Sequence, residues 1–485
     1  MLTKFKSLFG AQDMTRGNPL PVMLKFLLPL LIGNIAQLLY STADSIIVGK
    51  MLGANALFSV GASMPIQNLF FVFFMTVGSG VQVCVSQYYG AKDKERLSAN
   101  VGTAILLALI ATLTISAVGM PLARPILRAT KVDASVFGWS HDYLLIMFAG
   151  AVGVGFYNIL SGILRGMGNA TFPLFVLLGT TVLNIGLDLL FVGPLQMEVA
   201  GAALATVISQ TLSALVCLIR LAHMKDIVEI TRKTLRIRAD MVRQILRIGL
   251  PAGIMQGILS MSYVFVQGLI NSVVVVNAAG MASMTIFGAC NTAVTRVDAF
   301  ANLPNQAFSM VGSTYAGQNI GAGRLDRVKK GFKIMLGVSL CTSAVLFGLI
   351  YLFGGNLMRM FIDMSQPDAR QIIELGIHVQ RIMIWCYLIM AVMQPANGVL
   401  RGAGDTLPVM WITIVCTVFM RVPMAYAMVT LSKSALYPSG NPDGIFWSMV
   451  ICFTIAAAAC LTYYLTGRWK KKAVVRAPRP AENKA

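Results

Sequence analysis

Apolar stretches long enough to cross a lipid bilayer recur along the whole chain, and they constrain its fold more than any other feature. A helix of about 20 residues crosses the hydrocarbon core. Hydrophobic residues make up 56% of the chain and charged residues only 12%, whereas soluble domains carry about 25% charged residues. We therefore predict an all-α membrane protein with twelve transmembrane helices. They are expected at about residues 24–48, 56–84, 100–122, 143–163, 172–193, 200–221, 249–276, 282–314, 334–354, 379–400, 408–431 and 445–466.

The second half of the chain repeats landmarks of the first half. The segment Gly162–Asn169, with the sequence GILRGMGN, returns as Gly398–Asp405, with the sequence GVLRGAGD. Each half holds six apolar stretches, and an even number returns the chain to its starting side, so two parallel-repeat six-helix lobes are expected. Further echoes pair Pro29 with Pro251, Gly61-Ala62 with Gly288-Ala289, and Gly90-Ala91 with Gly321-Ala322.

These repeats predict four parts of the chain. The N-lobe should cover residues 1–221 and the C-lobe residues 248–467. A basic cytoplasmic linker over 222–247 would join them, and a basic cytoplasmic tail would follow over 468–485. The linker mixes charges with apolar residues, so a short helix along the membrane surface and a solvated linker both fit its sequence.

The positive charge is distributed as in a membrane protein. The formal net charge is +20, which taken alone could suggest nucleic-acid binding. With the amino terminus placed inside, however, 28 Lys and Arg residues fall on the cytoplasmic side and 7 on the outer side. This asymmetry follows the positive-inside rule. We therefore expect a multi-pass protein of the cell membrane with both termini cytoplasmic, no nucleic-acid partner, and a basic tail that contacts lipid headgroups.

Several kinds of chemistry lack their residues here. The eight cysteines form no Cys-x-x-Cys pair, and the three histidines lie far apart in sequence. We therefore expect no metal site, no cofactor and no enzyme activity. The Leu-Arg-Gly segments follow no strand, so they are interpreted as helix-ending turns rather than as a nucleotide-binding loop. A channel would need a filter-like motif, which is absent.

Three acidic residues lie well inside the predicted helices: Asp44, Asp188 and Asp298. A carboxylate at membrane depth costs about 2.5–3.5 kcal/mol on insertion scales and commonly marks an ion pathway or proton relay. Polar side chains share a helix face with two of them. Gln37 and Tyr40 lie on the stripe of Asp44, Asn184 lies one turn before Asp188, and Thr206 in the sixth stretch could add a hydroxyl. These groups are all in the first half and form a candidate cluster; the alternative is that they only hydrogen-bond between helices.

The chain resembles the multidrug and toxic compound extrusion (MATE) family of secondary transporters over roughly residues 15–470. The resemblance rests on the duplicated halves, on both Leu-Arg-Gly segments, on Gln318–Gly323, and on Asp44 before Val48–Gly53. In one prokaryotic branch of that family, a first-helix Asp and a fifth-helix Asn-x-x-x-Asp take part in cation coupling. The resemblance thus implies this role for Asp44, Asn184 and Asp188, with Gln37, Tyr40 and Thr206 matching other cluster positions of that branch.

The second half departs from the sodium-coupled branch of the family. That branch carries acidic residues in the seventh and tenth helices, and here 249–276 and 379–400 contain none. Asp298 in the eighth stretch is the remaining candidate for a second-lobe site. It could equally pair with nearby Arg296 and be structural.

We therefore expect an antiporter, acting as a monomer, that exports hydrophobic or cationic small molecules in exchange for H⁺ or Na⁺. Its lobes would rock around a central cavity, and protonation of the first-lobe carboxylates would drive release. One alternative is a lipid-linked oligosaccharide flippase of the same superfamily, which would need a basic groove; only Arg296 and Arg421 lie deep in apolar sequence. An intramembrane enzyme would need a nucleophile, metal or His/Asp constellation, and the sequence holds none.

Overall fold

The computed structural model describes residues 10–130, 132–276, 282–362, 364–365, 368–435 and 437–475. Nearly all described elements are helices. Only a small antiparallel hairpin, β1 (Val275–Val276) with β2 (Ala282–Ser283), departs from the all-α expectation. The helices are α2 (Pro19–Leu52), α3 (Ala54–Ala91), α4 (Lys94–Ala129), α5 (Ala134–Ala149), α6 (Ala151–Gly166), α7 (Thr171–Val192), α8 (Glu198–Ala222), α9 (Ala239–Ser272), α10 (Thr285–Ala301), α11 (Leu303–Gly321), α12 (Leu325–Arg359), α13 (Ala369–Gly402), α14 (Thr406–Ile414), η1 (Val415–Met420), α15 (Arg421–Leu431), α16 (Asp443–Leu465) and η2 (Arg468–Lys471).

These helices account for the twelve expected crossings. Within the described residues, nine helical segments are long and apolar enough to cross a bilayer, and α14, η1 and α15 together form one of them. A tenth crossing is the pair α5–α6, which bends by 52°. The two remaining expected stretches are not among these ten: 56–84 falls on α3, and 282–314 falls on α10 followed by α11. The helix boundaries differ from the expected ones mainly because α2, α3, α4, α9, α12 and α13 each run to 34 residues or more.

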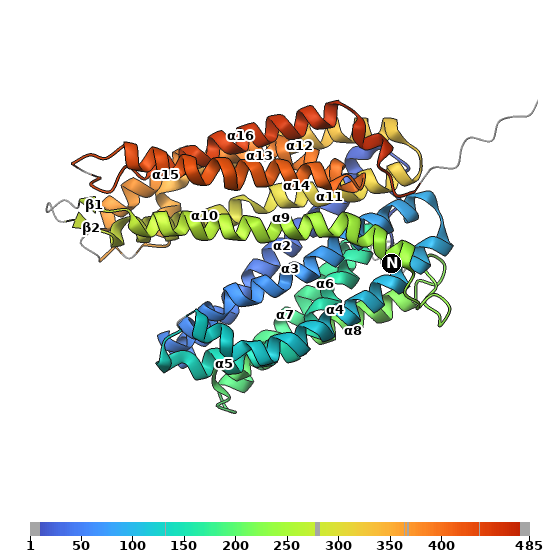
Figure 1. Cartoon of the computed structure of the whole chain (residues 1–485), viewed down its shortest axis with the longest axis horizontal. Helices are drawn as coiled ribbons and strands as arrows, with labels where there is room; N and C mark the ends of the chain where they lie inside the picture. The colour runs from blue at the N-terminus through green and yellow to red at the C-terminus, as the bar shows by residue number, and fades with distance from the viewer. Residues whose placement is uncertain are drawn as a thin grey trace, which may run out of the picture.

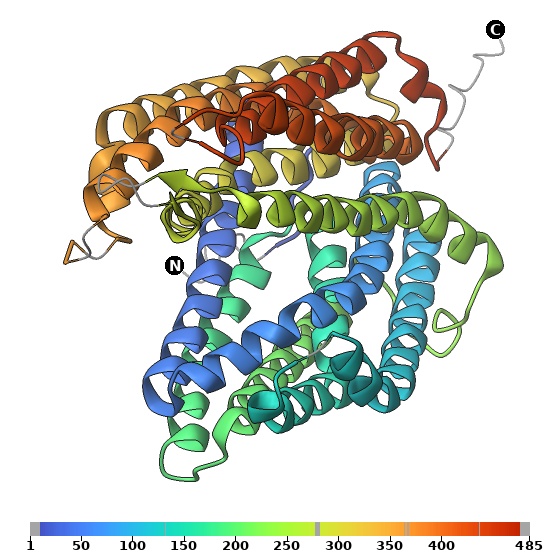
Figure 2. The same ribbon diagram turned by 60° about the vertical axis from the view of Figure 1, so that its left-hand side comes forward.

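The helices form two groups, α2–α8 and α9–α16, as the two-lobe expectation requires (Figures 1 and 2). The groups meet at the end of the molecule where the described chain begins and finishes, which we call the closed end. They splay apart toward the end that carries α5 and the β1–β2 hairpin, which we call the open end (Figure 1). The lobes are therefore joined mainly at one end.

Glycines line the contact between α3 and α9 near the closed end. A Cβ atom on Gly80 would overlap the carbonyl oxygen of Ile245, and one on Gly249 would overlap the carbonyl oxygen of Thr76. Only glycine allows two helix backbones to approach this closely, as in other membrane helix pairs with small residues at the interface. The seam between the lobes is thus a direct backbone contact.

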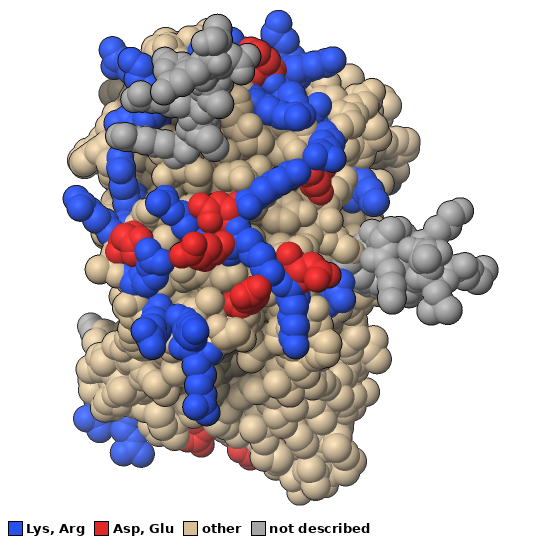
Figure 3. Space-filling model, turned by 90° about the vertical axis from the view of Figure 1, so that its right-hand side faces the viewer, with Lys and Arg blue, Asp and Glu red and all other residues tan. Residues whose placement is uncertain are grey.

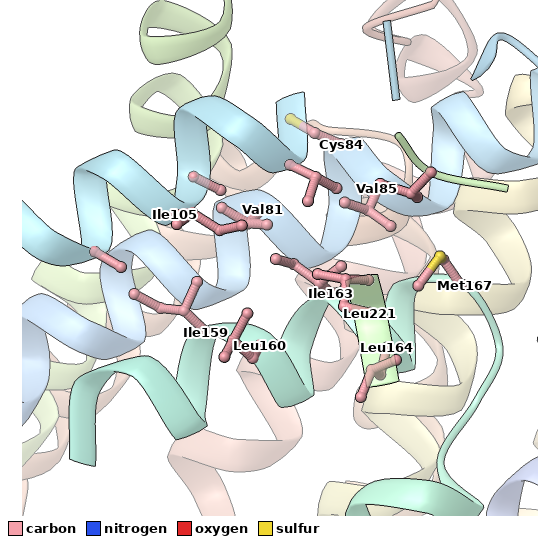
Figure 4. Close-up of a cluster of buried hydrophobic side chains, with 14 of the residues drawn as sticks. Val81, Cys84, Val85, Ile105, Ile159, Leu160, Ile163, Leu164, Met167 and Leu221 are labelled. Atoms are coloured by element: carbon pink, nitrogen blue, oxygen red, sulfur yellow. The ribbon is translucent and has the colours of Figure 1, made fainter. Parts of the chain in front are cut away.

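Each lobe has its own apolar core, but the first helix of each lobe begins in the core of the other. In the first lobe, buried residues of α3, α4, α6 and α8 interdigitate, among them Val81, Ile105 and Leu160 (Figure 4). Ile245, from the beginning of α9, belongs to this cluster. Conversely, Phe26 at the beginning of α2 belongs to the cluster of the second lobe. The expected division at residues 221 and 248 therefore does not separate the cores.

Two expectations for the basic segments need correction. The linker expected over 222–247 is shorter, because α9 already begins at Ala239, and residues 223–238 form turns instead of a surface helix. The segment is held by side chains of α4: Ser98 Oγ accepts from Glu229 N at 2.9 Å, and Thr103 Oγ1 donates to Arg236 O at 3.0 Å.

The tail expected over 468–485 starts as part of the fold. Trp469 is 1% exposed, and its indole nitrogen donates to Tyr464 O at 2.9 Å. An aromatic residue with its N–H satisfied in this way packs as a core residue. Residues 476–485 of the expected tail lie outside the described residues.

A pair of glycine substitutions in α9 tests the seam. Gly249→Ala should destabilise the protein by about 1–3 kcal/mol, because the added methyl group has no space against α3. Gly257→Ala is the matched control, since nothing lies within 4 Å of its added Cβ, and it should leave the melting temperature unchanged or slightly higher. Thermal unfolding in detergent measures both. Equal melting temperatures for the two variants would contradict a tight seam.

Candidate functional site

Two carboxylates of the first lobe face each other inside it. Asp44 comes from α2 and Asp188 from α7, which pack side by side. Asp188 is fully buried, Asp44 is 9% exposed, and the two side chains lie within hydrogen-bonding reach of each other. The sequence therefore brings together two acidic residues that are 144 positions apart.

The pair lacks the donors that buried carboxylates normally have. Both oxygens of Asp188 and Oδ1 of Asp44 find no hydrogen-bond donor among the described residues. Two ionised carboxylates in this arrangement repel each other and lose their hydration without compensation. A single shared proton removes the repulsion and supplies the remaining carboxylate with a donor, because the protonated group donates to it. The geometry is suited to binding one cation between the two groups.

A shell of hydroxyl and amide groups from other helices surrounds the carboxylates. The Tyr40 hydroxyl donates to Thr206 Oγ1 of α8 at 3.3 Å, and Gln210 of the same helix lies beside Tyr40. Tyr143 of α5 lies beside Gln67 of α3. Tyr40 and Tyr143 both lie within electrostatic range of the two carboxylates. The cluster thus joins four of the first lobe's helices around its centre, and α3 through Gln67.

The predicted site residues fare differently in the structure. Asp44, Asp188, Tyr40 and Thr206 come together. Asn184 is fully buried one turn before Asp188, and neither its amide nitrogen nor its oxygen has a partner among the described residues. Gln37 is exposed, unlike Tyr40 and Asp44 on the same stripe. Gln37 therefore does not belong to the buried part of the cluster.

Gln210, Tyr143 and Gln67 were missed by sequence reasoning. Gln210 could have been found, because it lies four residues after Thr206 and so shares its helix face. Tyr143 and Gln67 had no such signal: they lie on helices that carry no buried acid, and only the packing of α5 and α3 brings them to the site.

The second-lobe candidate Asp298 has a different environment. Its Oδ1 accepts hydrogen bonds from the Tyr387 hydroxyl at 2.9 Å and from Asn302 Nδ2 at 2.8 Å. The positive charge that interacts with Asp298 is the guanidinium of Arg421, in the eleventh crossing. The alternative pairing with Arg296 is not formed. Residues i and i+2 point to different faces of a helix, which explains why Arg296 cannot reach it.

The basic groove that a lipid flippase would need is not formed by the two arginines considered for it. Arg421 is 6% exposed and lies 5.6 Å from the centre of the Tyr263 ring. Arg296 is exposed on α10. The two therefore do not form a shared surface. Groups of three or more His, Cys, Asp or Glu residues that could hold a metal ion do not occur among the described residues.

Comparisons with known proteins agree with this architecture. The family model described as MatE matches residues 29–190 and 251–427, one segment in each half. "Probable multidrug resistance protein YpnP" of Bacillus subtilis is 29% identical over 95% of this chain and 98% of its own length. "Probable multidrug resistance protein YoeA" of the same organism is 27% identical over 93% of this chain and 94% of its own.

Solved structures share the fold over nearly the whole chain. A multidrug resistance MATE transporter in an outward-facing conformation superposes with a TM-score of 0.84, at 23% identity, covering 95% of this chain and 99% of that one. A transporter of the MOP superfamily from Pyrococcus furiosus gives a TM-score of 0.83 at 23% identity, covering 95% and 98%. With the matched family segments spanning both lobes, the chain belongs to the MATE family.

Proposed function

We propose that this protein exports hydrophobic or cationic small molecules across the cell membrane in exchange for H⁺. The observation that carries the proposal is the buried Asp44–Asp188 pair, in which three carboxylate oxygens have no hydrogen-bond donor among the described residues. A proton bound between them would remove a like-charge repulsion, so the shape of the first lobe would depend on whether the proton is present. The names of the multidrug resistance relatives support small-molecule export.

The proposed cycle uses the splayed lobes. A molecule bound between the lobes would be released at the open end, and the lobes would then rock to expose the cavity at the closed end. Lys and Arg side chains gather on the closed end (Figure 3), and the positive-inside rule favours the cytoplasm for that side. Each proton that moves inward through 100 mV would contribute about 2.3 kcal/mol to the export of substrate.

Sodium is the alternative coupling ion. Its preferred ligands are oxygens, as for other hard cations. Asn184 Oδ1, one turn from Asp188, adds a buried oxygen that has no partner within the described ranges. The same cluster could therefore accept either ion. The coupling experiment needs separate proton and sodium gradients.

Ethidium uptake into everted vesicles, whose cytoplasmic face is outside, tests the coupling. Vesicles with the wild-type protein should take ethidium into their lumen when the lumen is made acidic and not when only a sodium gradient is imposed. Asp188→Asn and Asp44→Asn should each lower the rate to that of vesicles without the protein, because the remaining carboxylate has no second carboxylate to repel it and proton binding no longer changes the shape of the lobe. Asp326→Asn is the control, since this carboxylate is fully exposed at the closed end. Normal export by both site variants would contradict the proposal, and sodium-driven export would reassign the ion.

Thermal stability tests the shared proton separately from transport. At alkaline pH, Asp188→Asn should raise the melting temperature, because it removes a buried charge that has no donor and adds an amide that can donate to Asp44; one unsatisfied buried group costs about 1–3 kcal/mol. The gain should shrink as the pH falls and the wild-type pair takes up a proton. Asp298→Asn should instead lower stability, because the Asp298 carboxylate already accepts two hydrogen bonds. A melting temperature of Asp188→Asn at or below that of the wild type at alkaline pH would contradict the shared proton.

A further inference from the structure

Two glutamines at the closed end reach across the interface between the lobes in matching ways. Gln87 of α3 donates from Nε2 to the carbonyl oxygen of Gly402 at 2.8 Å. Gln318 of α11 donates from Nε2 to the carbonyl oxygen of Gly166 at 3.2 Å. Both glutamines are 0% exposed. Each acceptor is the glycine of the Leu-Arg-Gly turn in the opposite lobe, so each lobe's glutamine binds the other lobe's turn.

The backbones beneath these bonds are also in contact. A Cβ atom on Gly90 would overlap the backbone of Gln318, and one on Gly321 would overlap the backbone of Gln87. Each glycine lies three residues after the glutamine of its own lobe. The arrangement leaves no space for water between α3 and α11, so the two amides must find their partners in the protein.

Segments near the two ends of the chain supply backbone donors to the side-chain oxygens of the two glutamines. Gln318 Oε1 accepts from Met14 N at 2.8 Å, and Gln87 Oε1 accepts from Val474 N at 2.7 Å. Met14 lies before α2, and Val474 follows η2. The amino-terminal segment thus closes on the second lobe and the carboxyl-terminal segment on the first.

The amino-terminal segment bridges the lobes by further bonds. Arg324 donates to Thr15 O at 2.7 Å, which ties the segment to α12 in the second lobe. Gln12 N donates to Met167 O at 3.1 Å, which ties it to the first lobe. These contacts lie beside the glutamines and belong to the same closed arrangement.

We propose that Gln87 and Gln318 are the gate residues of the closed end, and that their bonds to the opposite lobe must break together for that end to open. This proposal rests on the proposed function, in which the substrate enters the cavity from the closed end. Neutral amides are suited to the task, because protein hydrogen bonds are exchanged for bonds to water when the seam opens and the net cost stays small. They are positioning residues, since they act on the lobes and touch no substrate.

Isosteric removal of the amides tests the gate. Gln87→Met and Gln318→Met keep the approximate volume of the side chain and remove its donor and acceptor. Each should raise the population of molecules whose lobes are separated at the closed end by roughly fivefold, as expected for about one net hydrogen bond. The double variant should raise this population further than either single variant. Gln267→Met is the matched control, because Gln267 is exposed and bonds to Asn271 in its own helix.

Spin labels across the closed end supply the measurement. Labels at Glu95 on α4 and Lys330 on α12, both exposed, would report the distance between the lobes by double electron–electron resonance. The background needs Cys341→Ser, since Cys341 is the exposed cysteine and the other seven are buried. The variants should add a longer distance, whereas Gln267→Met should reproduce the wild-type distribution. This readout requires no transported drug, so its outcome is separable from that of the efflux assay.

The proposal has clear contrary outcomes. A folded double variant with the wild-type distance distribution would overturn it. If the Met variants fail to fold, truncation after Lys472 removes the Val474 and Val475 donors to Gln87 and keeps every helix of both lobes. The truncated protein should then show the longer distance at a smaller population, and a wild-type distribution at an unchanged melting temperature would overturn the proposal.

Discussion

The structure depends on the direct contact between helix backbones at the closed end. Glycines allow α3 to lie against α9 and α11 without intervening side chains. In lipid the hydrophobic effect does not drive helices together, so dispersion forces and hydrogen bonds of buried side-chain amides hold this contact. Because the lobes are joined mainly there, they can splay at the opposite end without losing their own cores. A tight seam at one end and separation at the other are the conditions under which two rigid lobes can rock.

The two halves share this scaffold and differ in their ionisable groups. The Leu-Arg-Gly turns and the glutamine–glycine contacts occur once in each lobe and bond across the interface in matching ways. The acids do not match. Asp44 and Asp188 face each other with three oxygens that lack a donor in the described part of the chain, whereas Asp298 accepts hydrogen bonds from Tyr387 and Asn302. A satisfied carboxylate serves packing, and an unsatisfied pair can respond to a bound cation, so the first lobe is the better candidate for coupling.

Much of this could be predicted from the chain because it depends on local composition. Twelve crossings, the duplication and the buried carboxylates follow from helix length, hydropathy and the cost of charge in lipid. The linker and the tail were harder. Their residues are polar and basic, which is typical of solvated segments. In the structure, however, Trp469 packs into the second lobe and residues 223–238 are hydrogen-bonded to α4. The sequence does not show which surface will cover such a segment.

The sequence by itself determined the membrane environment, the two-lobe repeat and most members of the carboxylate cluster, because each depends on residue type and on spacing along one helix. Only the tertiary structure decided that Gln37 stays exposed while Tyr143 and Gln67 join the cluster. Only it showed that the first helix of each lobe begins in the core of the other, and that Gln87 and Gln318 bond across the seam. These features depend on how helices distant in sequence approach each other, and at the seam between the lobes glycines set how close that approach is.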